Sequence, residues 1–287
     1  DKTMDYHFTK GNFTESELEK AIIELFKQQG YTYLRGDEIH RPFQDVLLYD
    51  ELKAFLLSRY PDLTQSELSK IISRLDNIPS SPLYEGNRDT YRLISEGFDF
   101  VREDASKIGI HIRFIDFNNV DNNSFKVVNQ FIVEDGHTRI PDMLIFINGI
   151  PVGIFEFKSA IDEGKTVHNA WEQITIRYAR DIPALLKYTA LSVICDGANT
   201  RLGTIFTPYE FYYAWNKANE QDTVANGISS LFTMVEGAFA KDRFLSILRD
   251  FIFYPDDSKK EEAIICRYPQ FFAANKMLAN IKAHKKP

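Results

Sequence analysis

The chain has 287 residues, of which 44% are hydrophobic and 26% charged, the ordinary composition of a globular protein with a sizeable core. Its formal net charge of −7 argues against a protein that coats nucleic acid, because such proteins are usually basic. No apolar run approaches the roughly 20 residues that span a bilayer, and the polar start, DKTMDYHFTK, does not resemble a signal peptide. We therefore expect no membrane partner.

The two cysteines indicate the cellular compartment. Cys195 ends the apolar run LSVIC and Cys266 ends the run AIIC, and neither has a CxxC partner. This pattern predicts reduced, buried thiols with a structural role. Reduced thiols are typical of a cytoplasmic protein, and that is the location we expect.

The first predicted element is a helix in TESELEKAIIELFKQQGY. Thr14 followed by Glu17 is a capping-box pattern, which places the start of the helix. Gly30 is predicted to end it as a C-terminal cap. An apolar stripe at helical spacing lies between these two signals and is formed by Leu18, Ile22, Leu25 and Phe26. More helix is predicted over residues 49–75, with polar breaks around Tyr60-Pro61 and from Asn77 to Pro82, and over residues 88–106.

After residue 110 the period of the apolar residues changes from that of helices to that of strands. Strands are predicted over residues 111–117, 125–134, 142–147, 152–158 and 189–196. A helix over residues 166–180 connects the last two. Beyond a polar connection at residues 216–226, the segments 228–253 and 259–284 have a mainly helical pattern. The order of elements predicts an α/β core followed by a helical segment.

Residues 142–158 predict a β-hairpin. Asn148-Gly149 is a strong turn signal between its two apolar strands. Pro151 beside the turn favours a three-residue loop, with Ile147 paired with Pro151, or else a bulge in the second strand. A plain two-residue turn would shift the register by one residue and move every side chain of one strand to the other face.

In the wider register Asp142 falls directly opposite Glu156, and Lys158 points to the same face two residues further on. Two carboxylates in a half-buried site repel each other and lose hydration, so a cation between them is expected. Mg²⁺ suits this place because it is typically held by one or two carboxylates plus substrate phosphate. Lys158 would then activate a water or stabilise charge on the phosphate. The alternative is a structural ion network in which Lys158 neutralises the pair.

The words around these residues resemble the PD-(D/E)xK nuclease signature and, more closely, the N-terminal part of the R subunit of type I restriction–modification enzymes. The resemblance covers most of the chain and is carried, in order, by VVNQFIVE (127–134), PDMLIFINGIPVGIFEFK (141–158), IPALLKY (182–188), SVICDG (192–197) and GTIF (203–206). It implies a central mixed β-sheet flanked by helices. It also implies a Mg²⁺-dependent endonuclease in which Asp142, Glu156 and Lys158 are catalytic and the first two bind the metal.

The same family carries a glutamate on its first helix, and a glutamine followed four residues later by a tyrosine on the helix after the lysine. Glu19 is the best match to the glutamate, and Gln173 to the glutamine. Tyr178 follows after five residues, and Arg177 occupies the fourth position. A regular helix would turn Tyr178 away from Gln173, whereas a helical bulge would restore the match. Whether Tyr178 or Arg177 takes the role of the family tyrosine therefore stays open.

The resemblance extends to the end of the chain. RYPQFFAANKMLANI (267–281) resembles the segment just before the ATPase motor, in which Gln270 would read adenine. The implied organisation is an endonuclease domain over residues 1–225, and a helical segment over 226–287 that leads into a motor absent from this chain. ATP is expected to bind the full-length subunit and not this fragment. The implied partners are double-stranded DNA and the methyltransferase (modification) and specificity subunits.

Two functions compete. The first is hydrolysis of DNA phosphodiesters with Mg²⁺, after ATP-driven translocation by the motor. The second is a non-catalytic, nuclease-like module that docks the motor onto the methyltransferase core. The spacing of Tyr178 is the sequence feature that favours the second function. Metal binding, and the effect of Asp142→Ala on cleavage, separate the two.

Overall fold

The computed structural model describes residues 13–159, 161, 164–225, 227–255 and 260–284. Its helices are α1 (Glu15–Gln28), η1 (Gly36–Glu38), α2 (Tyr49–Arg59), α3 (Gln65–Asp76), α4 (Leu83–Glu96), η2 (Val120–Asn122), α5 (Val167–Glu172), the π-helix η3 (Gln173–Tyr178), α6 (Ala179–Asp181), α7 (Pro183–Leu186), η4 (Tyr209–Phe211), α8 (Ile228–Ala238), α9 (Lys241–Asp250) and α10 (Tyr268–His284). Its strands are β1 (Thr32–Arg35), β2 (Phe98–Phe100), β3 (Ile110–Ile112), β4 (Phe125–Asn129), β5 (Val133–Glu134), β6 (Thr138–Arg139), β7 (Met143–Ile147), β8 (Ile150–Phe157), β9 (Leu191–Cys195), β10 (Thr200–Gly203), β11 (Ile252–Phe253) and β12 (Ile264–Ile265).

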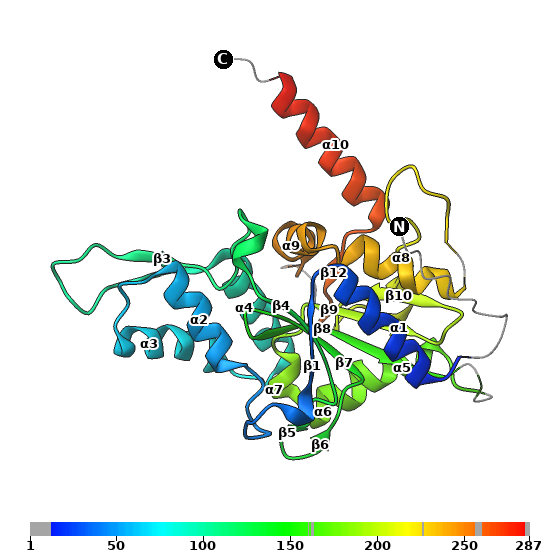
Figure 1. Ribbon diagram of the computed structural model, residues 1–287, viewed down its shortest axis with the longest axis horizontal. Coiled ribbons are helices and arrows are strands. Elements are labelled where there is room, and N and C mark those ends of the chain that lie inside the picture. Colours follow the sequence, from blue (N-terminus) through cyan, green and yellow to red (C-terminus); the bar gives the residue numbers. More distant parts are fainter. Residues whose placement is uncertain (1–12, 160, 162–163, 226, 256–259, 285–287) are drawn as a thin grey trace.

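Within these residues, six strands form one central sheet in the order β1-β4-β7-β8-β9-β10 (Figure 1). The pairs β1–β4 and β8–β9 are parallel, and the other neighbours are antiparallel. Strands β7, β8 and β9 are buried along their whole length. Strands that are apolar on both faces need cover on both sides. The predicted α/β fold, a mixed sheet flanked by helices, is therefore confirmed.

Successive residues of β8 point to opposite faces of the sheet, and different helices cover the two faces. On one face the Phe155 ring contacts Phe26 of α1, with ring centroids 5.8 Å apart, and Phe239 after α8, at 5.1 Å. On the other face Glu156 contacts Tyr178 of η3. The carboxylate at position 156 therefore faces the layer formed by α5 and η3, and α1 closes the opposite layer.

Helix α1 begins and ends where the sequence predicts. Thr14 accepts a hydrogen bond from the Glu17 amide, and the Glu17 side chain accepts one from the Thr14 amide, so the capping box is complete. Gly30 follows the helix with φ 84°, a left-handed conformation that side chains disfavour. The buried face of α1 packs on the sheet and consists of Leu18, Ile22, Ile23 and Phe26.

Three of the predicted elements are wrong in extent. The strand predicted over residues 111–117 ends with β3 at Ile112. The helix predicted over residues 88–106 stops at Glu96, because Gly97 takes φ 72° and turns the chain into the β2–β3 hairpin. The strand predicted over residues 125–134 divides into β4 and β5. Gln130 causes this break with φ 52°, which no strand residue adopts.

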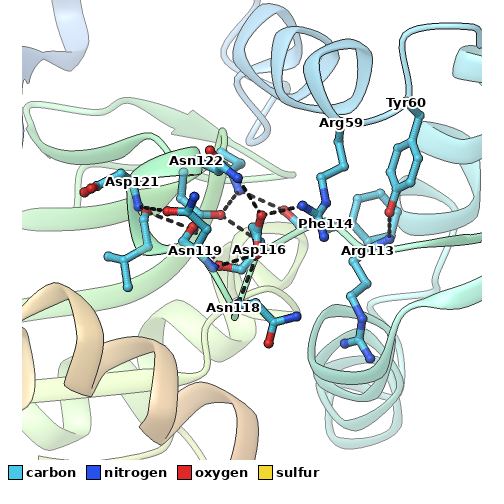
Figure 2. A network of polar contacts seen from close by, with 12 residues as sticks. Arg59, Tyr60, Arg113, Phe114, Asp116, Asn118, Asn119, Asp121 and Asn122 are labelled. Carbon is cyan, nitrogen blue, oxygen red and sulfur yellow. Dashed lines mark hydrogen bonds and ion pairs between the residues drawn. The ribbon is translucent and has the colours of Figure 1, made fainter.

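A polar network around Asp116 joins helix α2 to the connection between β3 and β4 (Figure 2). The buried Asp116 carboxylate accepts hydrogen bonds from Arg59, from the Asn122 side chain and from backbone amides that follow it. Burial acts to raise the pKa of Asp116, but these hydrogen bonds and the charge of Arg59 outweigh it and hold the pKa below its usual value. The Asn148 side chain, at the β7–β8 turn, bonds Phe114 O and the Ser124 amide. The network therefore anchors the turn of the hairpin.

Helix α8 lies beyond the predicted domain boundary at residue 225, and it packs on α1. Gln29 Nε2 donates a hydrogen bond to Val235 O at 3.0 Å, and Tyr31 Oη donates one to Phe239 O at 2.8 Å. Helix α10 projects from the body of the protein (Figure 1). The division of the chain at residue 225 stays a prediction.

Both cysteine thiols are unpaired and buried, as predicted. The Cys195 sulfur accepts hydrogen bonds from Thr200 Oγ1 and the Gly197 amide, so it has a local structural role at the end of β9. Among the helices of the described residues, none combines the length and the apolar character needed to cross a bilayer.

Candidate active site

Strands β7 and β8 form the predicted hairpin, with a tighter turn than the predicted three-residue loop. Ile147 pairs with Ile150 across Asn148-Gly149, whose φ angles are both positive, at 51° and 80°. The predicted pairing of Ile147 with Pro151 is therefore wrong. Between Pro151 and Gly153, β8 contains a β-bulge, the other device that the sequence allows. The extra residue of the bulge shifts the pairing of β7 with β8 by one residue, so that beyond the bulge the register is the one predicted from the wider loop.

The bulge brings the two carboxylates together. Beyond it Met143 pairs with Phe155, so Asp142 and Glu156 occupy matching positions at the same end of the sheet. The Glu156 side chain is buried, and Asp142 is partly buried. One Asp142 oxygen accepts a hydrogen bond from the Phe157 amide at 2.7 Å, which fixes the carboxylate at the end of β8.

This pair resists carrying two negative charges. Burial raises the pKa of Glu156 to about 8, and the charge of Asp142 adds to the rise, although Lys158 and Tyr178 oppose it. Burial also raises the pKa of Asp142 to about 6, against the hydrogen bond from Phe157 and the charge of Lys158. A bound cation would favour the ionised form of both groups and reverse these shifts.

Each oxygen of Glu156 has its own hydrogen-bond donor. Lys158 Nζ lies 3.1 Å from Glu156 Oε1, and the lysine side chain is 16% exposed. Tyr178 Oη donates to Glu156 Oε2 at 3.1 Å. The Lys158 backbone is itself held by a hydrogen bond to Cys195 O, so the residue continues the sheet. Two donors at opposite oxygens fix the plane of the carboxylate.

The π-helix η3 explains the unusual spacing of the glutamine and the tyrosine. In a π-helix residues five apart lie one above the other, so Gln173 and Tyr178 share a face. Tyr178 is buried against Glu156, and its pKa is raised well above its usual value by burial and by the neighbouring carboxylates, whereas Gln173 acts to lower it. Arg177 is exposed and donates to Gln173 Oε1 at 3.1 Å. The geometry therefore places Tyr178, and not Arg177, against the carboxylates.

The π-helix predicts that one residue of this segment is dispensable. Ile176 is 51% exposed, and its deletion would leave Gln173 and Tyr178 four apart, as on one face of an α-helix. We expect the deletion to change the free energy of unfolding by less than about 1 kcal/mol in chemical denaturation. The matched control deletes Ser73, an exposed residue of the regular helix α3. That deletion rotates the buried Leu75 outward and should cost several times more; equal costs would contradict the prediction.

Glu19 belongs to the helical layer on the other face of the sheet. It lies on α1, and its negative charge is one of the influences that raise the pKa of Asp142, after burial. Its carboxylate accepts a hydrogen bond from Asn129 Nδ2, at the end of β4. Asn129 belongs to no catalytic motif in the sequence. The only signal that points to it is an amide residue that ends an apolar strand in VVNQFIVE.

Gln270 lies apart from these residues. It is exposed on the first turn of α10, and its Oε1 accepts a hydrogen bond from the Arg267 amide at 3.0 Å. Together with Phe211 and Ile264 it lines a largely apolar cavity of about 320 Å³. Its role in reading adenine stays a prediction.

The donor set at the end of the hairpin fits Mg²⁺. Asp142 and Glu156 offer hard oxygen ligands, and Mg²⁺ is commonly held by one or two carboxylates with water and phosphate in the remaining positions. The charge balance fits as well, since two carboxylates and Lys158 carry a net charge of −1 when all are ionised. Within the described residues, no group of three or more His, Cys, Asp or Glu side chains lies close enough together to hold a metal ion.

The comparison with known families decides where the chain belongs. The family model described as "Type I restriction enzyme R protein N terminus" matches residues 12–211, a span that contains the whole hairpin and the helix after it. The chain belongs to this family. The suspected resemblance is therefore confirmed.

Relatives of this R-protein chain carry consistent names. A provisionally named type I restriction enzyme MjaIXP endonuclease subunit of Methanocaldococcus jannaschii is 29% identical over 286 residues, which cover 90% of this chain and 27% of that protein. The type I restriction enzyme HindI endonuclease subunit of Haemophilus influenzae is 24% identical over 276 residues, 91% of this chain and 26% of that protein. The chain thus spans about a quarter of the length of these relatives.

Proposed function

We propose that this chain is the Mg²⁺-dependent endonuclease domain of a type I restriction enzyme R subunit and hydrolyses DNA phosphodiesters. The observation that carries the proposal is the pairing of the buried Glu156 carboxylate with the partly buried Asp142 at matching ends of β8 and β7. Their raised pKa values mean that the fold places charge where it is unfavourable. Such a cost is typical of sites that serve a ligand, here a divalent cation.

Each residue of the site has a separate role in the proposed hydrolysis. Asp142 and Glu156 would hold Mg²⁺, and the metal would activate water and neutralise charge on the phosphate. Lys158 Nζ, beside Glu156 Oε1, donates a hydrogen bond to the attacking water or to a phosphate oxygen. Tyr178 holds the second oxygen of Glu156, and Gln173 supports Tyr178 on the same face of the π-helix. Glu19 of α1, held by Asn129 near the end of β7, would supply further negative charge.

The rest of the enzyme belongs to the same proposal. The relatives are about four times as long as this chain. In the proposed enzyme an ATPase motor would supply translocation, and the methyltransferase and specificity subunits would supply target choice. Double-stranded DNA would reach the site after ATP-driven translocation. Gln270 would read adenine only when the motor is present. We expect the complex to act in the cytoplasm.

The docking-module alternative loses its supporting observation. The sequence feature that favours it is the spacing of Gln173 and Tyr178, which departs from the family pattern. The π-helix accommodates that departure and keeps Tyr178 on Glu156. A nuclease-like site that had lost its catalytic function would not be expected to keep the hydrogen bond between Tyr178 and Glu156.

A substitution at Lys158 separates chemistry from metal binding. Lys158→Met keeps the length of the side chain and removes its charge. In the assembled full-length enzyme we expect DNA cleavage to fall by about 10²- to 10³-fold, the usual cost of removing one group that stabilises transition-state charge. Mn²⁺ affinity should change by less than about tenfold, since both carboxylates remain. Unchanged cleavage would instead support the docking module. Lys165→Met, a lysine outside the hairpin, is the matched control and should cleave normally.

A further inference from the structure

Asn129 lies close to Asp142 at the end of the sheet, and no sequence motif gives it a role. It is the last residue of β4 and pairs with Met143, the residue that follows Asp142. Its side chain is 7% exposed. A buried amide at the edge of a site needs partners for its oxygen and its nitrogen. The two partners that it has are informative.

Asn129 connects Tyr33 of β1 to Glu19 of α1. Tyr33 Oη donates a hydrogen bond to Asn129 Oδ1 at 2.9 Å, and Asn129 Nδ2 donates one to Glu19 Oε1. An ionised carboxylate only accepts hydrogen bonds, so the amide nitrogen has to face Glu19. The amide oxygen then has to face a donor, and Tyr33 provides it. The tyrosine hydroxyl thus selects the orientation of the amide.

Glu19 requires this support because its neighbour is negatively charged. Its donor Asn129 pairs with Met143, the residue after Asp142, so Glu19 is held near the end of β7, where like charges repel each other. A glutamate with free rotamers would turn toward solvent, where the charge is better hydrated. The hydrogen bond from a buried amide on the sheet keeps the carboxylate beside the site without a metal.

We propose that Asn129 is a positioning residue, which Tyr33 orients and which holds the Glu19 carboxylate near the strand end that carries Asp142, where its charge would strengthen metal binding. The inference rests on the proposed function. The competing explanation is that the amide only ties α1 to the edge of the sheet. In that case its loss would lower stability and leave the metal site unchanged, apart from any general effect on folding.

A double-mutant cycle on Mn²⁺ affinity distinguishes the two explanations. Calorimetric titration of Mn²⁺ into this chain would compare the parent with Asn129→Ala, Glu19→Gln and the double variant, with thermal melting as a check on folding. We expect each single substitution to weaken binding by about tenfold, the usual effect of losing a group that orients a metal site. The double variant should bind no more weakly than Glu19→Gln alone, because Asn129 acts through Glu19. Tyr33→Phe should weaken binding by roughly threefold, since the amide loses its fixed orientation.

The matched control is Asn118→Ala, which removes an exposed amide of the Asp116 loop shown in Figure 2. Its affinity should stay within about twofold of the parent. Additive losses in the double variant, or unchanged affinity in Asn129→Ala, would overturn the inference while leaving the metal site in place. Loss of binding in Asp142→Ala establishes that site independently. Absence of Mn²⁺ binding by the parent, both alone and with a DNA duplex, would overturn the proposed function and this inference together.

Discussion

Asp142→Ala in the full-length subunit should reduce DNA cleavage by the assembled enzyme by at least about 10³-fold, because a lost metal ligand removes about 4 kcal/mol of transition-state stabilisation. Asp142 and Glu156 lie at matching ends of adjacent strands, and the substitution would leave the metal with only one of these two carboxylate ligands. Assembly of the complex and ATP hydrolysis should stay at the parental level, since they are expected to depend on other surfaces. Cleavage of a plasmid that carries the recognition site measures the effect.

The matched control for this experiment is Asp121→Ala, which removes an exposed carboxylate outside the site. It should cleave at the parental rate. Parental cleavage by Asp142→Ala, in a complex that assembles and hydrolyses ATP, would contradict the assignment of the hairpin as the catalytic centre. It would favour the non-catalytic module.

Without metal, the protein should lose stability as the pH rises from about 5 to about 8. The pKa values of Asp142 and Glu156 are raised on folding, to about 6 and about 8. The folded state therefore binds more protons than the unfolded state in this range, and the free energy of unfolding falls with increasing pH. Below about pH 4 both carboxyl groups are protonated in the folded and in the unfolded protein, and the free energy of unfolding has its full value. It then falls as the pH passes the two folded-state pKa values. We expect a loss on the order of 4 kcal/mol.

Glu156→Gln removes most of this loss, because glutamine stays neutral. Thermal melting in the presence of EDTA should give equal melting temperatures for the variant and the parent at pH 5. At pH 8 the variant should melt roughly 10 °C higher. Glu134→Gln, an exposed glutamate, is the matched control and should follow the parent at both pH values. A parental pH profile in Glu156→Gln would contradict the buried, unfavourable charge.

Local signals in the sequence predicted the local structure well. The capping box at Thr14 and Glu17 and the glycine at position 30 set the ends of α1, because each acts within a few residues. Strand β1 gave no clear signal, since this short parallel strand depends on pairing with β4, far away in the chain. The helix predicted over residues 88–106 was too long, because the pattern of residues did not reveal that Gly97 takes a positive φ and ends α4.

The site was predictable to the extent that it depends on register. The even spacing of Asp142 and Glu156, together with Pro151, was enough to bring the carboxylates together, although a bulge and not a wider loop provides the shift. The sequence left open whether a π-helix or a regular helix carries Tyr178. The π-helix depends on a hydrogen bond from Tyr178 to Glu156 of a distant strand, which local sequence does not show. Asn129 was not predictable, since its role depends on Glu19 from a helix 110 residues away.

Titration of Mn²⁺ into this chain by calorimetry tests the central claim most directly, with and without a short duplex that carries an uncleavable phosphorothioate. We predict one site that is lost in both Asp142→Ala and Glu156→Ala, and tighter binding when the duplex supplies phosphate oxygens. This result would establish that the apolar hairpin carries its two carboxylates in order to hold a metal. Binding that survives both substitutions, or no binding even with the duplex, would contradict the claim.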